Sequence, residues 1–154
     1  KFIARRLIVF ASEDVGNADP DALQVAVAAA RAVEFVGLPE CRINLSQAAT
    51  YLALAPKSNA AYKAVDAALD DVRRDGNQPP PAHLRDASYR GAKELGHGTG
   101  YKYPHASGGW AEQQYLPDGL SGRRYYVPIR GVESELAARL DEIRRGAAGG
   151  DDEE

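Results

Sequence analysis

The segment from residue 20 to residue 36 constrains the fold of this chain more than any other. Apolar residues recur in it at helical spacing and form a stripe of Leu23, Ala26, Val27, Ala30 and Val33. Four more apolar residues surround the stripe, namely Val25, Ala28, Ala29 and Ala32. A helix that is apolar on nearly every side is buried at the centre of a fold or at a contact between subunits. These four residues are therefore candidate oligomer contacts, and both placements of the helix stay open.

Local patterns bound this helix and predict a helix before it. Asp19–Pro20 is typical of a helix start, because the side chain can cap the first turn and proline fits the first helical position. Gly37 is expected to end the helix. Residues 1–15 carry an apolar helical face of their own, and Gly16 is expected to end that earlier helix.

Two further helices are expected before residue 77. Asn44 and Gln47 have the spacing of a capping box and predict a helix start there, and this helix must end near Pro56. Ser58 can cap a fourth helix, which Gly76 closes. Because the connections are short, the four helices are expected to pack roughly antiparallel. Abundant alanine allows their axes to approach closely.

The chain changes character beyond residue 76. Residues 77–82 form a proline-rich connector, and a short helix is expected over residues 84–95. Residues 97–130 are rich in glycine, proline and tyrosine and show neither helical nor strand periodicity. A last amphipathic helix is expected over residues 132–145. Residues 146–154 are expected to form a disordered acidic tail.

The expected fold class is therefore all-α, a multi-helix bundle with a long irregular Gly/Tyr-rich segment. A chain of 154 residues suits one domain, here residues 1–145, with a helical core over 1–76 and a second part over 83–145. The single cysteine, Cys41, excludes an internal disulfide framework. The chain begins at Lys1 inside an expected helix and contains no methionine, so we expect a piece of a longer protein. No apolar run is long enough to span a bilayer, and no membrane partner is expected.

Charge is distributed unevenly along the chain. The net charge of −3 at pH 7 excludes a globally basic nucleic-acid binder. Residues 83–130, however, contain seven basic and four acidic residues together with all three histidines, the only tryptophan and six tyrosines. Basic residues interleaved with aromatic rings are typical of single-stranded nucleic-acid grooves. The candidate nucleic-acid or partner contacts are Tyr101, Lys102, Tyr103, His105, Trp110, Arg123 and Arg124.

The same tyrosines have a second interpretation. Tyrosines in a loop-rich segment also pin that segment to a helical body, with each hydroxyl group reaching a backbone partner. This structural role is the commoner one for clustered aromatic residues. From the sequence, both interpretations stay open.

The sequence predicts no catalytic or metal site in this chain. Gly96–Gly100 has the composition of a phosphate-binding loop, but it follows an expected helix rather than a strand, and no Walker A pattern is found. His83, His97 and His105 lack the spacing and the partner ligands of a metal site. We therefore expect no enzyme activity, cofactor or metal within this chain.

Several longer stretches resemble a known family. They are Arg5–Gly16, Ala18–Pro20, Glu34–Glu40, Tyr51–Asn59, His83–Ala87, Leu95–His105 and Gln113–Pro117. Over about residues 1–130 they resemble the C-terminal region of the replication-associated recombination protein A family. These AAA+ ATPases are also called maintenance of genome stability proteins and are related to the Werner-helicase-interacting protein. Ala106–Trp110 departs from the family pattern, since many relatives have a longer version that contains aspartate and tyrosine.

The resemblance implies a function that the patterns alone do not. It implies a helical domain, similar to the collar of clamp loaders, that assembles a AAA+ ATPase into a homotetramer for DNA replication, recombination and repair at stalled forks. The parent protein would be a DNA-dependent ATPase whose core binds ATP and Mg²⁺. Implied partners are further copies of the chain, DNA and single-strand-binding protein, in the cytoplasm with the nucleoid. The alternative function is a single-stranded DNA- or partner-binding module that uses residues 97–130.

Overall fold

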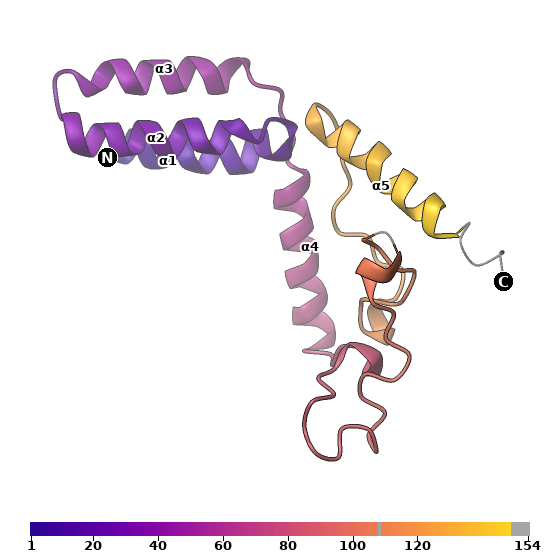
Figure 1. Ribbon diagram of the computed structural model, residues 1–154. Helices are drawn as coiled ribbons and strands as arrows, with labels where there is room; N and C mark the ends of the chain where they lie inside the picture. Colours follow the sequence, from indigo (N-terminus) through magenta and orange to yellow (C-terminus); the bar gives the residue numbers. More distant parts are fainter. Residues whose placement is uncertain (108, 149–154) are drawn as a thin grey trace. The chain divides into compact units, whose positions relative to one another are not determined.

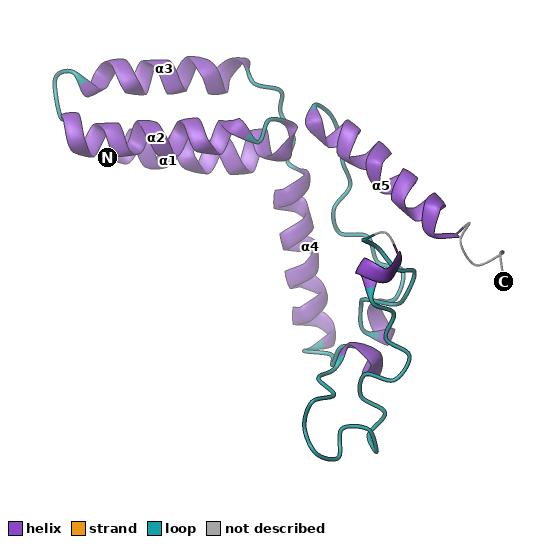
Figure 2. Cartoon of the chain, in the orientation of Figure 1, coloured by secondary structure: helices purple, strands orange, loops and turns teal. Residues whose placement is uncertain are grey.

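The computed structural model describes residues 1–107 and 109–148, and it divides into two compact units. The first unit contains residues 1–68 and 125–137, and the second contains residues 69–124 and 138–154. Within the described residues the regular secondary structure is helical and no strand is present (Figure 2). The expectation of an all-α fold is therefore confirmed.

Three helices form the body of the first unit. They are α1 (Phe2–Phe10), α2 (Asp21–Val36) and α3 (Cys41–Leu54), and they pack against one another (Figure 1). The α1 helix continues into a π-helical turn, Ala11–Val15, and then a 3-10 turn, Gly16–Ala18. The expected helix over residues 1–15 is therefore confirmed, with a wider final turn than an α-helix has.

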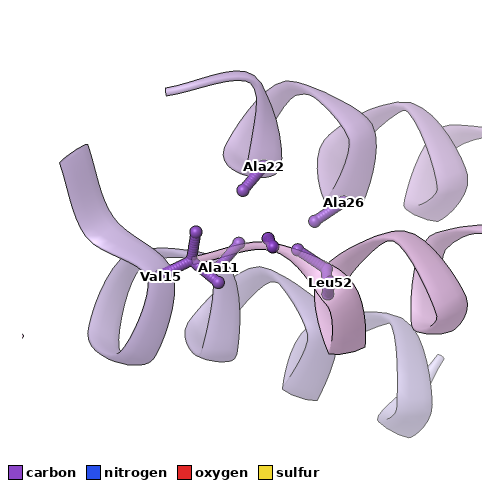
Figure 3. Packing of buried hydrophobic residues seen from close by; sticks show 6 residues of the cluster. Ala11, Val15, Ala22, Ala26 and Leu52 are labelled. Carbon is purple, nitrogen blue, oxygen red and sulfur yellow. The ribbon is translucent and has the colours of Figure 1, made fainter. Parts of the chain in front are cut away.

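The buried core of this body consists largely of alanine (Figure 3). Ala11, Ala22 and Ala26 meet at its centre together with Val15, and each is at most 1% exposed. Leu52 of α3 is the one large aliphatic side chain in this cluster. Small side chains allow the helix axes to approach closely, so the core has close contacts and little volume.

The ends of the helices follow the expected local chemistry at several points. The Asp21 N–H donates a hydrogen bond to Asp19 Oδ1 over 3.1 Å, as expected for a capping residue before α2. Gly16 adopts a positive φ of 54°, and a Cβ atom there would lie 2.7 Å from the Ser58 carbonyl oxygen. Ser58 caps helix α4 (Ala60–Asp75) as expected, because its Oγ accepts a hydrogen bond from the Ala60 N–H over 3.2 Å.

The capping box expected at Asn44 and Gln47 is wrong. Helix α3 begins three residues earlier, at Cys41, whose N–H donates to the Gly37 carbonyl oxygen over 2.9 Å. Arg42 also donates from its guanidinium to the Pro39 carbonyl oxygen over 2.7 Å. The chain therefore turns into the helix directly after Gly37, and Asn44 lies inside it.

The second unit contains the C-terminal half of α4 and a long stretch of turns. The helix expected over residues 84–95 is wrong, because only a 3-10 turn forms at Ala82–Leu84. Asp86 accepts hydrogen bonds from both the N–H and the hydroxyl of Ser88, each over 2.9 Å, and this local turn competes with a helix. Gly91 follows with a φ of 89°, which a continuing helix does not allow.

Two further 3-10 turns and a final helix complete the described chain. The turns are Pro104–Ser107 and Asp118–Leu120, and the helix is α5 (Val132–Ala148). The start expected for α5 is confirmed, and the helix extends three residues beyond its expected end at residue 145. Of the expected acidic tail, residues 149–154 lie outside the described residues.

The alanine-rich core predicts that Leu52 dominates its packing energy. Leu52→Ala should lower the free energy of unfolding by about 2–5 kcal/mol, because Leu52 is 1% exposed within the core cluster and its truncation leaves a cavity there. Urea denaturation followed by circular dichroism measures the change. Ser46→Ala is the control on the same helix. Its side chain is exposed and polar, so the change should stay within about 0.5 kcal/mol. Equal losses in the two variants would contradict this account of the core.

Candidate functional site

The four candidate oligomer contacts lie together in a hollow on the first unit. The hollow has a volume of about 200 Å³ and is lined by Val25, Ala28, Ala29, Ala32, Asn44, Gln47 and Ala48. Ala29 is buried, whereas Ala28 is exposed. Because α2 contributes only alanine and valine here, another helix can approach its backbone closely. That these residues contact a second subunit stays a prediction.

Large apolar side chains remain exposed on the same helical body. Phe35 at the end of α2 is 94% exposed, and Leu38 in the following turn is 82% exposed. Leu54 at the end of α3 is 88% exposed, and Ile43 near its start is 62% exposed. Single exposed apolar residues are ordinary in a monomer, but several on one small helical body are typical of an interaction surface.

Three of the six tyrosines in residues 83–130 have hydroxyl groups that are held by other groups of the chain. The Tyr89 hydroxyl group lies 2.7 Å from His97 Nδ1, and the Tyr115 hydroxyl donates to the Ala111 carbonyl oxygen over 2.8 Å. The Tyr126 hydroxyl donates to Glu133 Oε1 over 2.7 Å. The expected backbone partner is confirmed for Tyr115, whereas the partners of Tyr89 and Tyr126 are side chains.

Tyr101 and Tyr103 behave differently. Their side chains are 47% and 60% exposed, and among the contacts of the described residues neither hydroxyl group has a hydrogen bond. The His105 ring lies beside Tyr103, with ring centroids 5.2 Å apart and planes inclined by 51°. Lys102, between the two tyrosines, is exposed. These four candidate contacts therefore share one short accessible segment.

The remaining candidate contacts, which are Trp110, Arg123 and Arg124, lie outside this segment. Arg123 forms an ion pair with the buried carboxylate of Asp71 on α4, with Nη2 and Oδ1 2.8 Å apart, and Arg74 pairs with the same oxygen atom over 2.7 Å. The structure thus gives Arg123 a partner within its own unit. Arg124 is exposed, and Trp110 is half-buried. Their roles in binding stay predictions.

Most N–H groups of the glycine loop Gly96–Gly100 have acceptors within the chain. The N–H groups of His97 and Gly98 donate to carbonyl oxygens of the same unit over 3.0 and 2.9 Å. The N–H groups of Gly96, Thr99 and Tyr101 also have carbonyl acceptors. An anion cradle needs several free N–H groups that converge on one point. The loop therefore does not fit the phosphates of ATP.

Sequence analysis missed a buried carboxylate in the first unit. Glu133 of α5 is fully buried and accepts hydrogen bonds from the Ser58 hydroxyl over 2.7 Å and from the Ile129 N–H over 2.9 Å. The Tyr126 hydroxyl donates to its other oxygen atom, and Asn17 Nδ2 donates to that hydroxyl over 3.2 Å. Acidic residues are common in the first turn of any helix, so nothing in the sequence distinguishes this one.

These contacts set the protonation state of Glu133. Burial alone would raise the pKa of its carboxyl group, because a charged group loses water. The net pKa is nevertheless lowered below its usual value by hydrogen bonds from four donors: the Ile129 N–H, the Tyr126 hydroxyl, the Ser58 hydroxyl and the Arg130 N–H. Glu133 is therefore a charged acceptor that joins three distant parts of the chain.

A glycine permits this junction to close. Gly131 has a φ of 66°, and a Cβ atom there would overlap the backbone of Ala18. The preceding helix end is also secured, because Lys57 donates from Nζ to the carbonyl oxygens of Leu52 and Ala55 at the end of α3. The junction is thus built from backbone groups, the hydroxyl groups of Ser58 and Tyr126, and one carboxylate.

Comparison with known proteins identifies the family. Residues 1–144 match the family described as MgsA AAA+ ATPase C terminal. The chain belongs to this family. Among the residues that the structure describes, no helix combines the length and the apolar character needed to cross a membrane.

Individual relatives agree with this assignment. The chain is 52% identical over 138 residues to replication-associated recombination protein A of Bacillus subtilis, which covers 89% of the chain and 33% of that relative. It is 51% identical over 146 residues to a AAA domain-containing protein of Mycobacterium tuberculosis. This alignment covers 94% of the chain and 32% of that relative. ATPase WRNIP1 of Dictyostelium discoideum is 39% identical to the chain over 127 residues. This alignment covers 81% of the chain and 14% of that relative. The chain therefore spans about a third of the length of the two bacterial relatives.

The buried carboxylate predicts a pH-dependent contribution to stability. Glu133→Gln should lower the free energy of unfolding at pH 7 by about 1–3 kcal/mol, because the amide cannot accept from all the donors and places its own N–H₂ group among them. The pKa of Glu133 is lower in the folded chain, so its contribution is complete above the unfolded pKa of about 4.3 and is lost as pH falls through the folded pKa.

Urea denaturation between pH 7 and pH 3 measures this dependence. The difference between the unaltered chain and Glu133→Gln should shrink at the acidic end of the range. Glu135→Gln is the control, because Glu135 is exposed on the same helix and should change little at any pH. A difference that is independent of pH would show that the charge of Glu133 contributes nothing.

Proposed function

We propose that this chain is the oligomerisation module of a AAA+ ATPase in DNA replication, recombination and repair, and that it assembles as a homotetramer. The observation that carries the proposal is the hollow on α2 and α3, where all four candidate contacts lie at or near the surface. Its lining of small residues suits a closely packed helix from another copy. A module of this kind needs no catalytic residues of its own.

The exposed apolar residues supply the energy for such assembly. Full burial of a side chain such as Phe35 or Leu38 contributes about 1.5–3 kcal/mol each. Stable interfaces bury about 800 Å² on each partner, which is a small part of the 11048 Å² exposed by this chain. Large apolar residues beside a small-residue hollow give a surface the mixture of projections and depressions that close packing requires.

The place of the module in a larger protein follows from the family. Relatives three times as long carry the name replication-associated recombination protein A, and the family is the C-terminal part of AAA+ ATPases. The glycine loop of this chain does not fit ATP, so ATP and Mg²⁺ would bind elsewhere in the parent protein. DNA and single-strand-binding protein would be partners of that larger ATPase, in the cytoplasm with the nucleoid.

Charges placed in the hollow test the proposal. The double variant Ala28→Glu with Ala32→Glu should reduce the tetramer to smaller species, because four subunits would each bury two carboxylates without partners. Multi-angle light scattering at about 50 μM, a concentration at which weak assembly is visible, measures the mass. Circular dichroism checks that the helices remain.

A matched pair on α3 provides the control. Ala49→Glu with Ala53→Glu introduces the same charges at the same spacing on exposed positions outside the hollow. This variant should keep the mass of the unaltered chain. A monomeric unaltered chain, or an unchanged mass in the Ala28→Glu and Ala32→Glu variant, would overturn the proposal.

A further inference from the structure

We propose that Tyr101 and Tyr103 form a base-stacking surface for single-stranded nucleic acid, and that the side chain of Gln113 positions them. The inference is independent of the oligomerisation proposed above, because every residue in it lies in the second unit. It starts from two tyrosines that are exposed and without hydroxyl partners among the described contacts, although neighbouring tyrosines have such partners.

Gln113 fixes the backbone between the two tyrosines. Its Oε1 accepts a hydrogen bond from the Lys102 N–H over 3.1 Å, and its Nε2 donates to the Lys102 carbonyl oxygen over 2.9 Å. Nε2 also donates to the Tyr115 hydroxyl over 3.3 Å, and that hydroxyl is itself held by Ala111. One planar amide therefore pairs with both polar backbone groups of Lys102, as a neighbouring strand would.

This pairing determines where the side chains point. The N–H and C=O groups of one residue face the same way only when the backbone is extended, and residues 101–103 contain no helix or turn. In an extended chain, residues two apart project from the same side and are about 6.6 Å apart. Tyr101 and Tyr103 therefore share one side, and Lys102 projects from the other.

The spacing suits nucleic-acid bases. Bases in a stacked strand are about 3.4 Å apart, so two rings attached about 6.6 Å apart along an extended backbone can hold one base between them or two successive bases in an extended strand. Aromatic faces accept any base, because every base has a π-face. Two exposed rings whose hydroxyl groups have no partner among the described contacts, with the His105 ring beside Tyr103, therefore match single-stranded nucleic acid.

Positive charge lies beside the rings. A hollow of about 420 Å³ adjoins Tyr101, and the side chains of His83 and Arg85 also line it. Arg85 is oriented by a hydrogen bond from its Nε to the Pro80 carbonyl oxygen over 2.8 Å. Residues 83–103 contain four basic and two acidic residues in total. A phosphate group next to a stacked base would thus meet a cation.

The number of available cations limits the electrostatic share of binding. Arg123 is paired with the buried Asp71, and Lys102 projects from the side opposite the rings, so Arg85 is the cation that lines the hollow beside Tyr101. With few phosphate contacts, affinity should fall only slightly with salt, since the slope follows the number of neutralised phosphates. Stacking, rather than phosphate attraction, should therefore account for most of the binding.

The test compares an oligonucleotide with a base-free analogue. Fluorescence anisotropy with the full chain in 50 mM salt measures binding of a fluorescein-labelled oligothymidylate of 16 residues, a length within the known range for single-strand-binding folds. An abasic strand with the same number of phosphates is the matched ligand. We expect the oligothymidylate to bind at least tenfold more tightly, because stacking contributes about 1–3 kcal/mol per base.

Variants separate the rings from their surroundings. Tyr101→Ala with Tyr103→Ala should remove that preference, whereas Tyr101→Phe with Tyr103→Phe should retain it because the rings remain. Tyr62→Ala removes a comparably exposed tyrosine, 45% exposed, from the first unit and should change nothing. Light scattering of the same samples shows whether assembly is unchanged, so failure of this proposal is distinguishable from failure of the tetramer.

The variant Gln113→Ala tests whether Gln113 positions the two rings. Gln113→Ala should reduce the preference for bases over the abasic strand while leaving affinity for the abasic strand unchanged, which a general loss of folding would not do. Equal binding of both strands by the unaltered chain would overturn the proposal. So would unchanged binding after removal of both rings. Failure of a folded chain to bind either strand would also overturn it.

Discussion

The small size of the core side chains is the constraint on which this structure depends. Alanines such as Ala22 and Ala26 let the helices of the first unit approach closely, but they bury little apolar area. Only Leu52 adds a large aliphatic side chain to that cluster, while Phe35 and Leu38 remain outside. A body built in this way is firmly packed and still has apolar surface to cover. The same feature therefore accounts for both its shape and its proposed assembly.

One buried carboxylate connects this body to the chain that returns from the second unit. Glu133 takes its hydrogen bonds from residues far apart in the sequence, and no cation lies among the donors described for it. Because backbone N–H and hydroxyl groups surround the charge, it stays ionised although it is buried. Sequence patterns could not reveal this group, since its partners come together only in the fold. They did indicate one of them, Ser58, as a helix cap.

The sequence predicted the helices where local chemistry decides the outcome. Helix ends at Gly16 and Ser58 depend on the residues beside them, and both are confirmed. The errors arise where two local preferences compete. Asn44 resembles a cap but lies inside a helix that the preceding turn had already begun. Residues 84–95 have helical periodicity, yet an aspartate turn and glycines with positive φ prevent the helix. Among the tyrosines, only the fold shows which hydroxyl groups have partners.

The central claim is that assembly covers the apolar surface of the first unit. Hydroxyl-radical footprinting at low and high protein concentration tests it most directly, with Phe35 as the reporter because its side chain is 94% exposed. The account predicts that labelling of Phe35 falls severalfold as the chain assembles, while labelling of the exposed Tyr62 on α4 stays constant. Labelling of Phe35 that is independent of concentration, in a chain that scatters light as a monomer, would contradict the account.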